Sequence, residues 1–334
     1  MATSILVPID GSPFSEQALP TAVAIARRTG ARLQLVRVHE PVFTGPPFGD
    51  VPVPDPAWDR EMRLEEEARL RELASRVVEA GVEARAVVID GPVASALASC
   101  VEEVDADLVV MTTHGRNAFS RAWLGSVADV LVRKCTRPVL LLRPGEVGAE
   151  ALDLDVRHAP SFDHILIPTD GSAFSKQVVG RALALARPLG ARLTLLRVVP
   201  TARALGMDPE MPPPELARRR AVATEALGAM AEGLVTHGLR VRTAVVAHDD
   251  PPTAILEYAR EHGVGLIAMT THGRSGLARL ALGSVADQVL RGTETPLLLS
   301  RPVTGTRSRL SRLLEREWQE EARPDEARSI AAPG

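Results

Sequence analysis

One stretch with the layout of an anion-binding loop occurs twice in this chain. The first copy reads MTTHGR from Met111 and LGSVAD from Leu124, and the second repeats both sequences from Met269 and Leu282. Each copy follows a short apolar run and leads into a helical pattern. In the order strand, glycine loop, helix, free backbone N–H groups at the helix start point at an anionic ligand. Each copy could therefore hold a phosphate group, or could simply make a turn.

An aspartate follows the first apolar run of each half, in the sequences ILVPIDGS and ILIPTDGS. In an open α/β sheet the ligand site lies beyond the C-terminal ends of the strands, where the strand order reverses. Asp10 and Asp170 could therefore lie beside the glycine loops and contact the same ligand. The alternative is that both aspartates only stabilise a turn.

Other residues of the two loops also have structural alternatives. Ser126 and Ser284 fit the capping pattern in which a serine is followed three residues later by an acid, and that role needs no ligand. We expect His114 and His272 to be turn residues, because no second His, Cys or carboxylate lies at metal-ligand spacing. The loop arginines, which could reach a phosphate or stay solvated, are Arg116 and Arg274.

Several kinds of site are excluded by what these loops lack. A P-loop needs a lysine directly after its second glycine, and the lysines of this chain are Lys134 and Lys176 alone. The dinucleotide fingerprint follows the first strand of its unit, whereas these glycines follow the fourth. The sequence has no nucleophile elbow and no paired carboxylates. We therefore expect no catalytic residue and no metal ligand, and at most slow ATP hydrolysis.

The elements that carry these residues repeat along the chain. The offset between the copies is 160 residues at the aspartates and 158 at the glycine loops, so the repeating unit is a domain rather than a short solenoid repeat. Apolar runs and turn residues predict strands over 4–9, 33–38, 84–89, 108–111 and 139–142, and helices over 13–28, 60–80, 93–104 and 127–134. The second half predicts strands near 165–169, 193–198, 241–246, 266–269 and 297–300. This alternation predicts parallel sheets with helices on both faces.

The domain organisation follows from this repeat. We predict a first α/β domain over 1–144, a Gly- and Asp-rich linker over 145–162 and a second α/β domain over 163–302. The charged tail, 303–334, is helical or disordered, and is either a solvated segment or a docking helix for a partner.

Composition narrows the class of protein. The net charge of −3 gives no reason to expect binding to nucleic acid or to an anionic membrane. The two cysteines cannot build a disulfide framework or a metal cluster. The chain starts with an apolar strand rather than a basic and apolar leader, which predicts a cytoplasmic protein.

At these loops the chain resembles the universal stress protein family. Its nucleotide-binding members have Gly-x2-Gly-x9-Gly-Ser/Thr after the fourth strand and an aspartate at the end of the first. The corresponding patterns here, with threonine in place of the first glycine, are Thr112-x2-Gly115-x9-Gly125-Ser126 and Thr270-x2-Gly273-x9-Gly283-Ser284. The resemblance covers nearly all of 3–302. It implies two tandem open five-stranded parallel sheets in the order 3-2-1-4-5, with helices on both faces, paired as a pseudo-dimer through 139–142 and 297–299.

The resemblance also implies a ligand and the residues that bind it. The ligand would be ATP, with or without Mg²⁺, although AMP or a cyclic nucleotide could also fit. In the first half the implied contacts are Pro8, Asp10, Val38, Thr112, Gly115, Arg116, Gly125, Ser126 and Val127. In the second half they are Pro168, Asp170, Val198, Thr270, Gly273, Arg274, Gly283, Ser284 and Val285.

The function implied is that of an ATP-binding sensor or regulator in stress response. The alternatives are a nucleotide-free interaction scaffold and a weak ATP hydrolase. Further partners would be a second tandem chain, forming a homodimer, and an unidentified protein.

Overall fold

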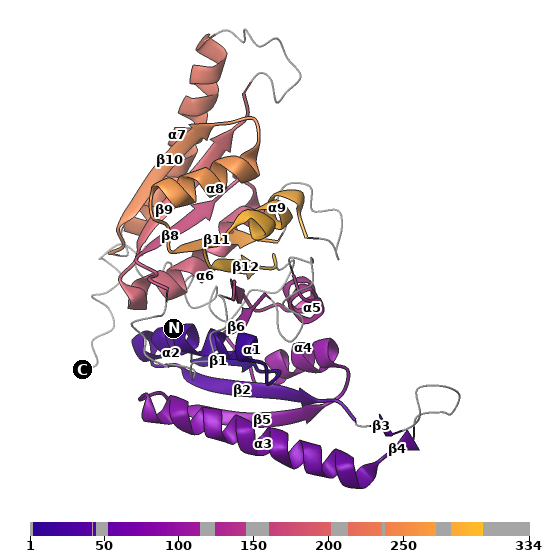
Figure 1. The fold of residues 1–334 in the computed structure, drawn as a ribbon. Helices are drawn as coiled ribbons and strands as arrows, with labels where there is room; N and C mark the ends of the chain where they lie inside the picture. The colour runs from indigo at the N-terminus through magenta and orange to yellow at the C-terminus, as the bar shows by residue number, and fades with distance from the viewer. Residues whose placement is uncertain are drawn as a thin grey trace, which may run out of the picture.

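Ten strands form one continuous sheet that runs through both halves of the chain (Figure 1). The computed structural model describes residues 3–41, 43–44, 53–113, 124–144, 160–201, 213–235, 238–271 and 282–302. Within these ranges, no helix combines the length and the apolar character needed to cross a membrane.

Strands and helices alternate in the first half. Its elements are β1 (Ser4–Pro8), α1 (Pro13–Glu16), α2 (Ala18–Thr29), β2 (Arg32–His39), β3 (Phe43–Thr44), β4 (Val53–Pro54), α3 (Pro56–Glu79), β5 (Ala84–Asp90), α4 (Val93–Glu103), β6 (Leu108–Thr112), α5 (Ser126–Lys134) and β7 (Val139–Leu142).

In its described residues the second half repeats this order, with the single helix α6 in place of α1 and α2. Its elements are β8 (His164–Pro168), α6 (Ala173–Leu189), β9 (Arg192–Val199), α7 (Pro213–Val235), β10 (Val241–Ala247), α8 (Pro251–Glu261), β11 (Leu266–Thr270), α9 (Ser284–Gly292) and β12 (Leu297–Ser300).

Local sequence signals explain where the first helices begin and end. The side chain of Ser12 accepts a hydrogen bond from the backbone N–H of Ser15, and Pro13 occupies the first helical position, as predicted. Gly30 ends α2 in the left-handed conformation, with a φ of 71°. The single helix predicted over 13–28 is wrong in one respect, because the structure divides it at Gln17 into α1 and α2.

The proline-rich stretch 41–58, in which no strand or helix was predicted, contains regular structure. Strand β3 pairs with β4 in antiparallel register. Helix α3 begins at Pro56, earlier than the predicted residue 60, because the Asp55 side chain accepts hydrogen bonds from the N–H groups of Ala57 and Trp58. An aspartate cap followed by proline is a strong helix start, and here it overrides the surrounding prolines.

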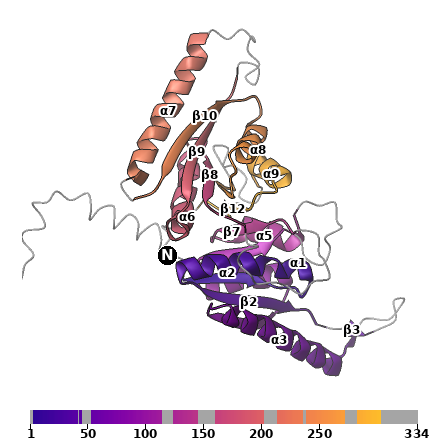
Figure 2. The ribbon, with the colours of Figure 1, turned by 60° about the vertical axis from the view of Figure 1, so that its left-hand side comes forward.

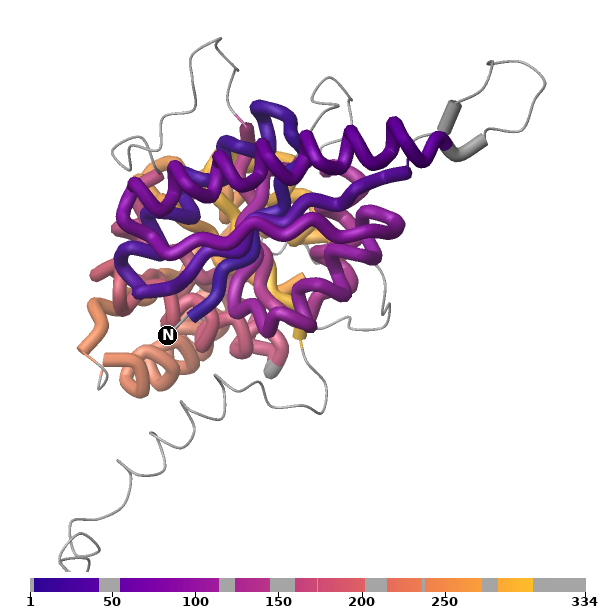
Figure 3. The backbone as a smooth tube through the Cα atoms, turned by 90° about the horizontal axis from the view of Figure 1, so that it is seen from below, coloured from indigo at the N-terminus to yellow at the C-terminus, as the bar shows by residue number. Residues whose placement is uncertain are grey.

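The strand order is β10-β9-β8-β11-β12-β7-β6-β1-β2-β5. Each half therefore has the order 3-2-1-4-5, and the parallel pairing within each half is as predicted. The fifth strands join the halves in antiparallel register, with Leu298 opposite Leu140 and Leu297 opposite Leu141. The predicted pseudo-dimer through the fifth strands is confirmed. Figure 3 shows the first half, in indigo and purple, stacked in front of the second.

Two layers of helices cover the sheet. Helices α2, α3, α6 and α7 cover what we term the first face, and α4, α5, α8 and α9 cover the second face (Figure 2). Each face has one hydrophobic core that contains buried residues of both halves. Helices α2 and α6 pack against each other across the boundary between the halves. The halves therefore share their cores as well as their sheet.

We predict that the pairing of the fifth strands contributes strongly to stability. Leu140 is fully buried, and replacing it with alanine should lower the free energy of unfolding by about 2–5 kcal/mol, as deletion of a packed leucine does. The same replacement at Leu64, which is 58% exposed on α3, should change it by less than about 0.5 kcal/mol. Urea denaturation of the two variants measures the difference, and equal losses would contradict a packed junction.

Candidate nucleotide site

The start of helix α5 is fastened to the end of strand β6. The N–H of Gly125 donates to the carbonyl oxygen of Thr113 at 2.7 Å, and the N–H of Thr113 donates to the carbonyl of Leu142 at 2.8 Å. The second half repeats the first of these bonds, between Gly283 and Thr271, at the same 2.7 Å. The Gly-Ser pairs that the sequence singled out therefore lie at the C-terminal edge of the sheet, where a ligand of an open α/β fold binds.

Glycine, not serine, caps each of these helices. Gly125 has the extended N-cap conformation, with φ −64° and ψ 153°, and Gly283 has the same conformation. The capping roles predicted for Ser126 and Ser284 are therefore wrong: both serines are the first residues inside their helices, and both are exposed. The physical reason is that the glycine adopts the extended conformation of the N-cap. Each serine is therefore the first residue of its helix instead of the cap.

The acids of the expected capping pattern do not reach back to the helix start. Asp129 pairs with Arg133 one turn later at 2.7 Å, and Asp287 pairs with Arg291 at 2.8 Å. The N–H groups of the first helical turn have no partner within their helix. The exposed serine hydroxyls lie beside them, which is an arrangement suited to an anion.

The aspartates after the first strands do hold turns. A carboxylate oxygen of Asp10 accepts hydrogen bonds from the N–H of Ser12 at 2.8 Å and from its hydroxyl at 2.6 Å. Asp170 accepts from the N–H of Ser172 at 2.9 Å. Both aspartates therefore stabilise turns. This is compatible with a ligand role, because a carboxylate offers about four lone-pair positions on two oxygens.

Four valines predicted to contact the ligand lie on one face of the sheet. Val38 and Val127 in the first half, and Val198 and Val285 in the second, are partly buried against the core of the second face. This is the face on which α5 and α9 begin. Pro8 and Pro168 are half-buried at the ends of β1 and β8. Each half therefore brings its predicted apolar residues to the same side as its Gly-Ser helix start.

The threonines that replace the family's first glycine are buried, at 5% exposure for Thr112 and 7% for Thr270. Side chains alternate between the faces along a strand, and Val110, two residues before Thr112, belongs to the core of the first face. The Thr112 side chain is therefore expected on the first face, away from the start of α5. Outside the described residues lie His114, Gly115, Arg116, His272, Gly273 and Arg274.

Comparison with known proteins finds relatives over most of the chain. The model of the universal stress protein family matches residues 1–143 and 161–301. A universal stress protein of Mycobacterium tuberculosis (strain H37Rv) is 28% identical over 306 residues, covering 89% of this chain and 96% of the relative. A universal stress protein of Thermus aquaticus is 34% identical over 146 residues, covering 43% of this chain and all of the relative.

The chain belongs to the universal stress protein family. The crystal structure of a universal stress protein from Archaeoglobus fulgidus is similar to it, with a TM-score of 0.65, 19% identity, and coverage of 91% of this chain and 97% of that one. A universal stress protein structure from Pseudomonas aeruginosa has a TM-score of 0.61 at 18% identity, with coverage of 95% and 98%. The tandem α/β fold predicted from the sequence is thereby confirmed.

Sequence reasoning missed an ionic cluster on the first face of the first half. His39, which is 2% exposed, bonds through Nδ1 to Glu66 at 2.8 Å and through Nε2 to Asp59 at 3.0 Å. Arg37 pairs with the other oxygen of Glu66 at 2.5 Å. The cluster ties the end of β2 to α3. In the sequence, Arg37 and His39 alternate along one side of a strand, and Asp59 and Glu66 lie seven residues apart on a helix. No other pattern marks these residues as partners.

These contacts shift the pKa values of the cluster. Burial of the ring lowers the pKa of His39, but the hydrogen bonds and charges of Glu66 and Asp59 raise it by more, so that it lies above the ordinary 6.5. Burial raises the pKa of Glu66, but Arg37 and His39 lower it by more. His164 differs: burial is the main cause of its lowered pKa, although the carbonyl of His262 opposes the shift.

We predict opposite pH dependences for the two histidines. His39 has a raised folded-state pKa, so its stabilisation is complete below about pH 6.5 and is lost as the pH rises through the folded pKa. His164 has a lowered pKa, so its contribution is present above about pH 6.5 and is lost as the pH falls. Urea denaturation of His39→Gln and His164→Gln between about pH 5 and 9 should give differences from wild type that change with opposite signs. Slopes of the same sign would contradict these environments.

Proposed function

We propose that each half of this universal stress protein binds one ATP and that the protein acts as a nucleotide-dependent sensor or regulator in stress response. The observation that carries the proposal is the bond from Gly125 to Thr113, which seats a helix N-terminus on the end of the fourth strand, and its repetition at Gly283 and Thr271. A helix N-terminus at the C-terminal edge of an open sheet is a recurrent phosphate site.

The remaining residues fit the other parts of an adenine nucleotide. The half-buried Pro8, Val38 and Val127 offer an apolar surface for a base. Asp10, at the end of the first strand, offers carboxylate oxygens to ribose hydroxyls. Ser126 presents an exposed hydroxyl to the phosphates beside the first N–H groups of α5. Pro168, Val198, Val285, Asp170 and Ser284 supply the same set in the second half.

Magnesium would enter with the nucleotide rather than occupy a protein site of its own. Among the described residues, no group of three or more His, Cys, Asp and Glu could hold a metal ion. Mg²⁺ usually keeps several waters and binds through substrate phosphates and one or two protein oxygens. Asp10 and Ser126 would suffice for that mode of binding.

Nucleotide binding is tested by denaturing the purified protein, identifying the released small molecules by mass spectrometry, and titrating the emptied protein with ATP in a calorimeter. We expect two ATP per chain. Gly125→Val or Gly283→Val should remove one site each, because a branched side chain at the N-cap obstructs access to the first helical turn. The double variant should give no heat of binding.

The matched control is Gly228→Val, because nothing lies within 4 Å of a Cβ added at this position of α7. It should leave the stoichiometry unchanged. Absence of released nucleotide together with absence of heat from the wild-type protein would refute the proposal.

A further inference from the structure

The side chain of Arg37 lies against the turn that carries Asp10. The N–H of Ile9 donates to the carbonyl of Val36 at 2.8 Å, so the residues that follow each of them are neighbours at the ends of β1 and β2. Gly11 has a left-handed φ of 81°, and a Cβ added to it would collide with Nη1 of Arg37. The guanidinium is therefore in close contact with the backbone of the turn.

This contact comes from the face of the sheet opposite the residues assigned to the nucleotide. Val36 is buried in the core of the second face, and Val38 packs against the same core. Because side chains alternate along a strand, the Arg37 side chain between them points to the first face, under α3. Arg37 is thus in a position to hold the turn, and not to touch a nucleotide bound beside Val38 and the start of α5.

The guanidinium of Arg37 is itself held by an acid of α3. The side chain is 11% exposed, and its Nη2 pairs with Glu66 at 2.5 Å. Among the described residues, the buried Nε of Arg37 has no hydrogen-bond partner. A buried charge depends strongly on its partner, because an uncompensated charge in the interior is costly. The position of Arg37 therefore depends on Glu66.

His39 bridges two carboxylates only when both of its ring nitrogens carry a proton. Its Nδ1 faces Glu66 at 2.8 Å, and its Nε2 faces Asp59 at 3.0 Å. The imidazolium donates to both acids, whereas the neutral ring has one N–H and one lone pair and can donate to only one of them. Loss of the proton therefore leaves a lone pair facing a carboxylate and removes a positive charge next to the pair of Glu66 and Arg37.

Other charged groups surround His39. Asp90 of β5 lies opposite it in the strand register and pairs with Arg63 of α3. Arg63 also pairs with Glu67 at 3.5 Å, and the exposed Glu40 follows His39 in the chain. Histidine is the side chain that changes its charge in the neutral pH range. Within this set of groups, the change of charge near neutral pH therefore falls on His39.

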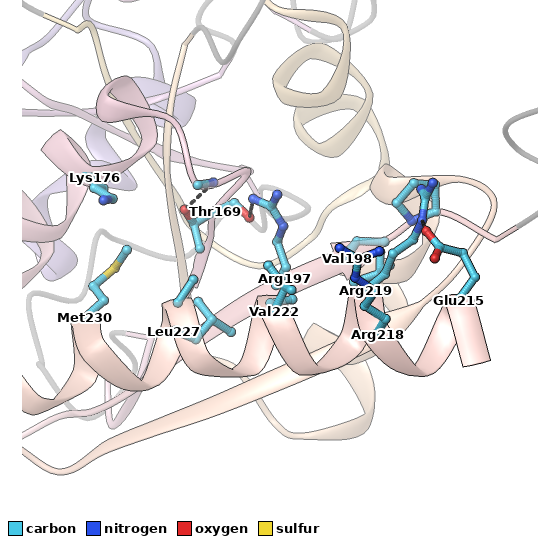
Figure 4. Close-up of a pocket in the computed structure, with 15 residues that line it drawn as sticks. Thr169, Lys176, Arg197, Val198, Glu215, Arg218, Arg219, Val222, Leu227 and Met230 are labelled. Carbon is cyan, nitrogen blue, oxygen red and sulfur yellow. Dashed lines mark hydrogen bonds and ion pairs between the residues drawn. The ribbon is translucent and has the colours of Figure 1, made fainter. Parts of the chain in front are cut away.

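The second half keeps the arginine beside its glycine turn. Arg197 follows Arg37 by the same 160 residues that separate the two aspartates. Its Nη1 donates to the carbonyl oxygen of Thr169 at 3.1 Å, and a Cβ added to Gly171 would lie 3.0 Å from the same nitrogen. Figure 4 shows Arg197 beside Thr169. Contact between an arginine and the turn is therefore common to both halves.

The histidine and its acidic partner are not repeated at the corresponding positions. Val199 stands 160 residues after His39. The long helices align at an offset of 157 residues, at which buried leucines of α3 and α7 coincide, and Ala223 stands at the position of Glu66. A cavity of about 370 Å³ lies here in the second half, with Val199 and Ala223 in its lining (Figure 4). The two turns therefore differ in what holds their arginines.

We propose that Arg37 and His39 are positioning residues of the ATP site in the first half, and that a proton on His39 strengthens ATP binding at that site alone. The proton completes the bridge from Glu66 to Asp59. Glu66 then holds Arg37, and Arg37 holds the turn that presents Asp10. This role rests on the proposed ATP site, because both residues act on the ligand through the turn.

The sign of the pH dependence follows from the environment of the ring. Burial lowers the pKa of His39, but the two carboxylates raise it by more, so that it lies above 6.5 in the folded chain. The bridge is complete below that pKa, and ATP binding in the first half is strongest there. The affinity should fall as the pH rises through the folded-state pKa of His39.

The test is calorimetric titration with ATP of a chain in which Gly283→Val leaves only the first site. Between about pH 6 and 9, its affinity should fall by about fivefold or more relative to the same chain with His39→Gln, fivefold being the lower end of typical coupling between sites. Comparison of the two chains at each pH cancels the ionisation of ATP itself. Arg37→Met should likewise remove the pH dependence, because it breaks the link between the histidine and the turn.

Two controls show whether the effect belongs to His39 and to the first site. His262→Gln removes an exposed histidine of the second half and should leave the pH profile of the first site unchanged. In a chain with Gly125→Val, which keeps only the second site, His39→Gln should leave the affinity within about twofold of its parent at every pH.

A measurement without ATP separates this role from the proposed function. Glycine-selective isotope labelling limits the NMR spectrum to the 25 glycines of the chain. The amide resonance of Gly11 should titrate with the midpoint of His39 in the wild-type chain, and His39→Gln should remove this titration. The amide resonance of Gly171 should be the same in both chains.

Two results would overturn the proposal while leaving the ATP sites intact. One is an ATP affinity of the first site whose pH profile is the same with and without His39. The other is a Gly11 resonance that does not respond to His39→Gln. Absence of ATP binding at both sites would refute the proposed function and, with it, a role of these residues in binding, and a titrating Gly11 would then still show that His39 controls the turn.

Discussion

The antiparallel pairing of β7 with β12 is the constraint on which the rest of the structure depends. Both strands are apolar at nearly every position and buried on both faces. An unpaired strand of this kind would be an exposed, aggregation-prone edge. Pairing removes both edges at once and allows each face of the sheet to form one core through the whole molecule. The pairing also positions the start of α5. The N–H of Thr113 donates to the carbonyl of Leu142 at the end of β7, and the carbonyl of Thr113 accepts a hydrogen bond from Gly125.

The two halves preserve their backbone and differ in their long helices. The hydrogen bond from the N-cap glycine of the last helix to the threonine after the fourth strand is 2.7 Å long in both halves. Ser12 and Ser172 cap the first helices in the same way. The helices over the first face have diverged. Glu66 and Asp59 of helix α3 bond to His39 of strand β2, whereas α7 has Ala223 and Leu216 at the corresponding positions, 157 residues later. The two halves are therefore more alike in the sheet and its turns than in the contacts between the sheet and the long helices.

Much of this fold could be predicted from the sequence, because buried strands are short apolar runs between turn residues such as Gly30 and the Asp-Gly-Ser turns. The strand order and the pairing of the fifth strands came from the resemblance to a family. Errors arose where two local signals compete: Gly125 takes the capping position that a serine pattern suggested, and Asp55 starts a helix inside a proline-rich stretch.

The ionic cluster could not have been predicted by the same means. It brings together a strand and a helix that are separated by a long connection, and residues such as Arg37 and Glu66 carry no local pattern that marks them as partners. Their chemistry depends on the distance between a helix and a sheet, which only the packed structure defines.

Joining two unlike halves in one chain has a consequence for stoichiometry. Two separate chains held by the same strand pairing would dissociate on dilution, whereas here the effective concentration of one half around the other is set by covalent linkage. Association therefore does not depend on how much protein is present. Every molecule carries the half with the ionic cluster around His39 and the half with Val199 at the corresponding position, in a fixed one-to-one ratio. A mixture of separately made chains would also form pairs of like halves.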